Sequence, residues 1–173
     1  MSKSNLLLVT GALIMGTLFM WIVAGQNFAT VDKLLSSSQS AAFAAHIESH
    51  GRDNMRLDLR YLVSELNRTF FQTWNWTQTL LIVLALVLIY TGKLDDRLAR
   101  LAALAVLVLV LTMTLWLSPA MVQLGRALDF VPRDPTPPGL ARFQQMHGVF
   151  VVLDGIKLGL LVFLAFRLVK PRA

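Results

Sequence analysis

The sequence predicts an all-α membrane protein: a polytopic four-helix bundle with a long helical hairpin that projects beyond the bilayer between helices 1 and 2. Two features of composition predict this class, because 55% of the 173 residues are hydrophobic and only 15% are charged. An average soluble domain has roughly 25% charged residues. The third observation is that the apolar residues are clustered in four stretches, as in membrane-spanning helices. The length allows a single integral membrane domain over residues 1–173.

The four stretches approach the roughly 20 apolar residues that cross a bilayer. We expect spans at about residues 5–27, 73–91, 98–118 and 143–169. The first exceeds the ~7–15-residue core of a signal peptide and precedes no A-x-A site, which predicts a retained helix. Four aromatic residues extend the second span on its loop side, as interfacial aromatic residues do; they are Phe70, Phe71, Trp74 and Trp76. Pro119 predicts a kink or an end of the third span.

The connection between the first two spans, about residues 29–70, is compatible with helices. Gly51 is suited to end one helix and Asp53 to begin the next, while the serines at 36–38 are able to bend the first arm. From Asn54 onward apolar residues repeat at helical spacing without a breaker before Gly92, which predicts one helix about 55 Å long. We therefore expect an αα-hairpin with its tip at Gly51, standing outside the membrane.

Basic residues predict the orientation. Seven Lys and Arg residues lie within about twenty positions near the helix ends beside both termini and the 92–97 connection, whereas the eight on the other side are spread over about seventy positions. The positive-inside rule then places both termini in the cytoplasm, in a bacterial-type inner membrane. The net charge is +6, which in a soluble protein suggests binding to nucleic acid. Here the basic residues flank apolar segments, so the expected partner is the lipid bilayer and not nucleic acid. The chain has no cysteine, which excludes disulfides and thiolate metal ligands.

Charged residues inside the fourth span are the best sequence indication of function. Asp154 and Lys157 are one helical turn apart, and a lone charge at mid-bilayer costs at least ~2.5–3.5 kcal/mol. At ~100° per residue, His147 lies near the same face, so His147, Asp154 and Lys157 form a predicted intramembrane polar stripe. The stripe is interpretable as a proton relay, an ion path or a haem site with His147 as axial ligand. We favour an ion pair that fixes helix register, because the apolar stretches of the other three spans, residues 6–23, 79–90 and 101–117, hold no charged residue.

Two weaker patterns remain. His46 and His50, at i and i+4, are a candidate metal pair, although a solvated helix face is the favoured interpretation. Amide side chains near one interface are interpretable as a polar cluster or, as we favour, as headgroup contacts; they are Gln26, Asn27, Asn67, Gln72, Asn75 and Gln78. No phosphate loop, nucleophile elbow or pair of catalytic carboxylates occurs. The sequence therefore predicts no catalytic residue and leans against an enzyme.

Three short motifs carry a family resemblance: residues 16–24 (GTLFMWIVA) with the following Asn27-Phe28, residues 116–119 (WLSP) and residues 143–148 (FQQMHG). They resemble the transmembrane-protein-205-like family, a small four-helix membrane domain of unknown function related to copper-resistance-D-like proteins. Some of those relatives bind haem, so the resemblance implies haem or metal handling as a possibility. The family continues its last motif as H-G-[LV]-S-x-L-x-N, where this chain has Phe150 at the serine and Asp154 at the asparagine.

The predicted function is that of an integral membrane protein acting through contacts. It is an accessory, structural or assembly subunit of a larger complex, with other membrane protein subunits as partners. The alternative is a haem- or metal-handling or transport protein that uses His147 and the Asp154–Lys157 pair. The sequence identifies no cofactor, and haem and a metal ion are the open possibilities.

Overall fold

The computed structural model of the protein describes residues 3–92, 94–132 and 134–169. These residues form helices and connecting turns, with no strand among them. The elements are α1 (Lys3–Ser36), α2 (Ala41–His50), α3 (Arg52–Thr91), α4 (Arg97–Thr112), the π-helical turn η1 (Met113–Leu117), α5 (Ser118–Arg126) and α6 (Leu140–Val169). Four helices are long and apolar enough to cross a membrane, namely α1, α3, the continuous stretch Arg97–Arg126 and α6. The prediction of an all-α chain with four such helices is confirmed.

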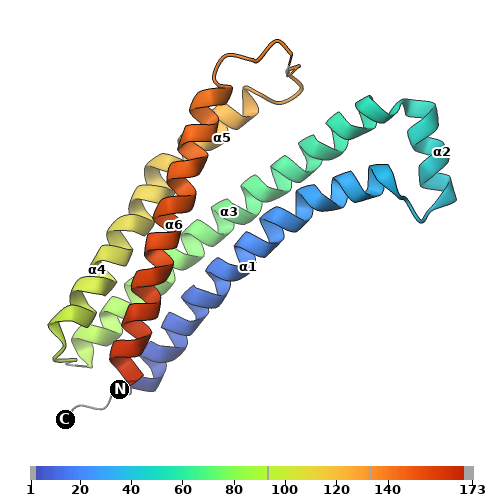
Figure 1. Ribbon diagram of the computed structural model, residues 1–173. Helices are drawn as coiled ribbons and strands as arrows, with labels where there is room; N and C mark the ends of the chain where they lie inside the picture. The colour runs from blue at the N-terminus through green and yellow to red at the C-terminus, as the bar shows by residue number, and fades with distance from the viewer. Residues whose placement is uncertain (1–2, 93, 133, 170–173) are drawn as a thin grey trace.

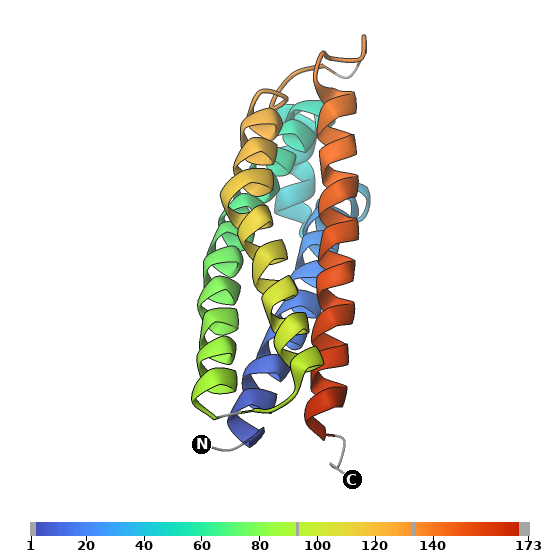
Figure 2. The same ribbon diagram turned by 90° about the vertical axis from the view of Figure 1, so that its left-hand side faces the viewer.

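The long helices lie side by side and alternate in direction along the chain (Figure 1). Helix α1 packs against α3 and α6, and α4 packs against the same two helices. Both views place the start of α1 and the end of α6 at the end of the molecule that carries the α3–α4 connection (Figures 1 and 2). At the opposite end α1 and α3 lean away together from α5 and α6 and carry α2 (Figure 1).

Apolar side chains at helical spacing fill the space between the long helices. The main cluster includes Leu13 of α1, Ile82 and Ile89 of α3, Val106 of α4 and Leu161 of α6, each at most 1% exposed. Large apolar side chains on the outer faces of the helices are exposed; Leu80 and Phe166, for example, are each 71% exposed. A helix with apolar residues on both its inner and outer faces is suited to lipid on the outside and helix contacts on the inside.

The end of the hairpin has two corners, one at the predicted tip, Gly51, and one at residues 37–40, next to the serines that were expected to bend the first arm. Helix α1 continues to Ser36, and α2 is a separate short helix that crosses between α1 and α3. At the first corner the Ser38 hydroxyl accepts from the Ser40 amide at 3.2 Å and donates to the Ser40 carbonyl at 3.3 Å, local bonds that compete with continuation of the helix. Ser40 then caps α2 by accepting from the Phe43 amide at 3.3 Å. Gly51, with φ of 87°, forms the second corner.

Pro119 neither ends nor sharply interrupts the third long helix. The turn before it widens into η1, in which the Ser118 amide donates to the Met113 carbonyl. Proline has no N–H and its ring clashes with the carbonyl four residues earlier, and a wider turn relieves both problems. The helix then continues as α5 to Arg126. The expected kink or end is thus a local widening of the helix.

An ion-pair network fastens the loop after α5 to α3. Arg68 of α3 donates two hydrogen bonds to Asp129, at 2.8 and 2.9 Å, and one to Glu65. Arg126 also reaches Glu65, at 3.3 Å. Beside these groups the rings of Tyr61 and Phe130 lie 5.0 Å apart. The loop is therefore held by a bidentate arginine pair, the strongest geometry for such contacts.

Acid is expected to weaken this network. Hydrogen bonds from Arg126 and Arg68 lower the pKa of Glu65, which lies outside the expected spans, below its usual 4.5. A carboxylate whose pKa is lower in the folded state contributes stability above the unfolded pKa and loses it as the pH falls through the folded pKa. We therefore expect the melting temperature in detergent micelles to drop below about pH 4.5, and to drop less in Glu65→Gln. Glu48→Gln, an exposed control, should keep the wild-type slope; equal slopes in all three proteins would contradict the assignment.

Candidate functional site

The structure brings Asp154 and Lys157 into direct contact on α6. Lys157 Nζ lies 2.5 Å from Asp154 Oδ1, and the i, i+3 spacing places both on one helix face. Lys157 is 0% exposed and Asp154 is 5% exposed. The ion pair is therefore buried between helices and does not face lipid.

Side chains from two other helices complete the coordination of this pair, one from α1, which packs against α6, and one from α3, which lies across the bundle from it. Gln78 of α3 accepts from Lys157 Nζ through its Oε1 at 2.7 Å. Trp21 of α1 donates from its indole Nε1 to Asp154 Oδ2 at 2.6 Å. Each carboxylate oxygen has a donor, and the ammonium has an acceptor on another helix besides the carboxylate. Burying charges in a low-dielectric site is tolerable when such bonds are all made.

The network continues from Gln78 to a fourth helix. Gln78 Nε2 donates to Asn75 Oδ1 at 2.9 Å, and Asn75 Nδ2 donates to Ser118 Oγ at 2.8 Å. We call the connected set the polar clamp, which consists of Trp21, Asn75, Gln78, Ser118, Asp154 and Lys157. It links α1, α3, α5 and α6 through side chains alone. In a bilayer such bonds connect helices that gain little from apolar contact with one another.

Helical spacing explains why the members of the polar clamp meet. Asn75 and Gln78 lie on the face of α3 that continues as the buried Ile82 and Ile89. Lys157 similarly lies on the face of α6 that continues as the buried Leu161 and Leu164. Helices α3 and α6 run in the same direction, and Gln78 precedes the end of the apolar part of α3 by about as much as Lys157 precedes the end of α6. The two polar segments are therefore level with each other.

His147 lies outside this network. Its side chain is exposed and stacks against the ring of Phe143, with centroids 6.3 Å apart and an interplanar angle of 12°. Two helical turns separate it from Asp154, so sharing a face of α6 does not bring the two side chains together. The structure thus joins two members of the predicted stripe and leaves the third apart.

His46 and His50 are adjacent on the exposed face of α2. Their rings stack with centroids 5.4 Å apart, and His50 Nε2 lies 4.0 Å from Asp58 Oδ2. Over residues 3–92, 94–132 and 134–169, no group of three or more His, Cys, Asp or Glu side chains is placed to hold a metal ion.

Sequence reasoning missed the partners of the ion pair. For Asn75 and Gln78 the sequence favours headgroup contacts over a polar cluster, but the two side chains are 2% and 1% exposed and the cluster is the arrangement that the structure has. Trp21 and Ser118 were not considered as polar partners. The sequence did hold an indication of this contact. A lysine inside a span needs hydrogen-bond acceptors on other helices, and the amide of Gln78, at the edge of the second span, is able to accept. Of the other amides, Asn27 bonds Asn67 at 2.7 Å between α1 and α3.

Comparisons of the chain with protein-family models, with curated proteins and with solved structures find no match. The polar clamp and the surfaces of the helices are therefore the features of the molecule that bear on its function.

Proposed function

We propose that the protein is an accessory or assembly subunit of a larger membrane complex. Its four long apolar helices are compatible with an integral membrane protein. In the proposed topology both termini lie on the cytoplasmic side of a bacterial-type inner membrane, because the basic residues are densest there. The hairpin of α1, α2 and α3 then stands on the opposite side.

The polar clamp supports a structural role for the buried charges. A relay or ion path needs groups that exchange partners with water or substrate, whereas the Asp154–Lys157 pair is bonded to Trp21 and Gln78. Such bonding fixes the register of α6 against α1 and α3. A membrane subunit that acts by presenting a surface needs this kind of fixed arrangement.

The observation that carries the proposal is an apolar stripe on the part of α3 that precedes its expected span. We call Leu62, Leu66 and Phe70 the hairpin stripe; they are 54%, 40% and 41% exposed and are spaced four residues apart. Leu66 lies about 10 Å along the helix from residue 73, where the span is expected to begin. In the proposed topology the outer part of the hairpin stripe, at Leu62 and Leu66, lies beyond the lipid. An exposed apolar surface outside the lipid is suited to contact with a protein partner.

Charge placed on the hairpin stripe is expected to release the protein from its complex. Wild type extracted in mild detergent should migrate on native gels as a particle larger than the monomer. Leu62→Glu with Leu66→Glu should migrate as a helical monomer, because a partner would have to bury two carboxylates. Arg56→Gln, on another exposed face of α3, should leave the complex intact.

Three outcomes would contradict this proposal. They are a monomeric wild type under every mild extraction, equal dissociation by Arg56→Gln, and an unaltered complex in the double glutamate variant. The same preparation also tests the alternative function. A Soret band or a stoichiometric metal that His147→Ala removes would favour haem or metal handling.

A further inference from the structure

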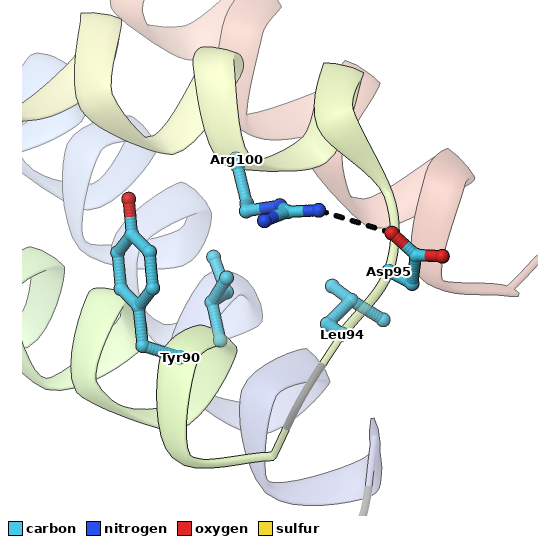
Figure 3. Close-up of a pocket in the computed structure, with 5 residues that line it drawn as sticks. Tyr90, Leu94, Asp95 and Arg100 are labelled. Carbon is cyan, nitrogen blue, oxygen red and sulfur yellow. Dashed lines mark hydrogen bonds and ion pairs between the residues drawn. The ribbon is translucent and has the colours of Figure 1, made fainter.

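A second polar feature lies at the end of the molecule that carries the α3–α4 connection. A cavity of about 260 Å³ opens there between the last turn of α3 and the first turn of α4. Its lining consists of Ile89, Tyr90, Leu94, Asp95 and Arg100. Figure 3 shows the Arg100 guanidinium in the middle of this group, between the Tyr90 ring and the Asp95 carboxylate.

Arg100 has hydrogen-bonding capacity that the described residues do not use. Its Nε is buried and has no partner among them. One terminal nitrogen donates to Asp95 Oδ1 at 3.1 Å, but the Asp95 side chain is 91% exposed. An ion pair with so exposed a partner contributes little. A buried, charged N–H without an acceptor is costly, so an oxygen ligand in the cavity would be stabilised.

The chemistry of the cavity favours a phosphate group. A guanidinium presents parallel N–H groups in a fork that matches phosphate oxygens, and Tyr90 offers a hydroxyl beside it. Ile89 and Leu94 form apolar walls of the cavity. Such walls suit the first carbons of an acyl chain, next to the headgroup. Tyr90 is 55% exposed at the end of an apolar helix segment, the position of an interfacial aromatic residue.

We propose that this cavity binds the phosphate of an anionic phospholipid headgroup through Arg100. The ligand replaces Asp95 on the guanidinium of Arg100, whose side chain is 37% exposed, and its binding reorients that side chain so that the buried Nε also gains an acceptor. Asp95 is then a competitor of the ligand, because its carboxylate occupies the same guanidinium and repels an anion. This site shares no residue with the polar clamp or the hairpin stripe. The test of lipid binding is therefore independent of the test of the proposed function.

The test is the melting temperature of the full-length protein in maltoside micelles, titrated with phosphatidylglycerol, with phosphatidylcholine or with inorganic phosphate. Phosphatidylglycerol should stabilise wild type more than phosphatidylcholine does. Arg100→Gln should weaken this specific effect roughly tenfold in lipid concentration, the factor that corresponds to one lost charge-assisted bond. Asp95→Asn should strengthen it. Arg97→Gln, an exposed arginine in the same helical turn, should retain most of it.

Several outcomes would overturn the proposal. Equal losses in Arg97→Gln and Arg100→Gln would indicate diffuse attraction to basic residues, and an unchanged response in Arg100→Gln would exclude the cavity. Stabilisation by inorganic phosphate alone that Arg100→Gln removes would support the phosphate site but overturn the lipid as its ligand. If Arg100→Gln does not fold, Arg100→Lys keeps the charge without the fork and should still lose most of the effect.

Discussion

Replacing Asp154 or Lys157 alone is expected to destabilise the protein more than replacing both. Either single change leaves one charge buried among helices, and an uncompensated buried charge costs roughly 3–5 kcal/mol. Asp154→Asn keeps an oxygen for the Trp21 indole but leaves Lys157 without its counter-ion. Lys157→Met leaves the carboxylate and deprives Gln78 of its donor. The double variant removes both charges, so its stability should be closer to that of wild type.

The measurement is a double-mutant cycle on unfolding in one detergent. A large favourable coupling is expected, and additive single effects would show that the two charges do not depend on each other. His147→Gln serves as control on the same helix. It should change stability by less than about 0.5 kcal/mol, because the side chain is exposed and outside the polar clamp.

The same double variant separates a structural pair from a relay. If the polar clamp only fixes helix register, Asp154→Asn with Lys157→Met should fold and still migrate within the larger complex. If the charges carry protons or ions, the variant should assemble normally but lose the activity of that complex. Loss of assembly with retained folding would place the pair at the partner surface, which its burial argues against.

The sequence predicts the helices and the i, i+3 pair because both depend on local spacing. Helical periodicity gives the face on which Lys157 lies, but it does not say which helix is adjacent or what lies at the same level. The contact between Lys157 and Gln78 spans 79 positions and depends on the packing of α6 against its neighbours. The same limit explains His147, which shares an angular position with Asp154 but lies two turns away from the polar clamp.

Local chemistry also decided details that hydrophobic patterning left open. Serine hydroxyls that bond to nearby backbone separate α2 from α1, so residues 37–40 form a corner. Pro119 changes the structure of the helical turn that precedes it, which widens into η1. Both outcomes follow from local hydrogen bonding; the serines at 36–38 predicted the bend, but not that residues 41–50 would form a separate helix.

Adding a methyl group at Gly16 of α1 is expected to disrupt the contact between α1 and α3. A Cβ at this position would lie 2.0 Å from the Trp74 ring, far inside van der Waals contact. Small residues allow helices in membranes to approach closely, and overpacking such a contact typically costs 1–3 kcal/mol. Gly16→Ala should therefore lower the melting temperature, and Gly16→Leu should lower it further.

Gly11→Ala is the matched control for this prediction. It lies on the same helix with nothing within 4 Å of an added Cβ, so the gain in helix propensity should make it neutral or stabilising by up to ~1 kcal/mol. The atoms that a Cβ at Gly16 would meet belong to the six-membered ring of the Trp74 indole. Trp74→Phe shortens this side chain, so the double variant should recover much of the stability that Gly16→Ala loses. If Gly16→Ala and Gly11→Ala behaved alike, the indole would not press against α1. The close approach of α1 to α3, and with it the position of Trp21 beside Asp154, would then require another explanation.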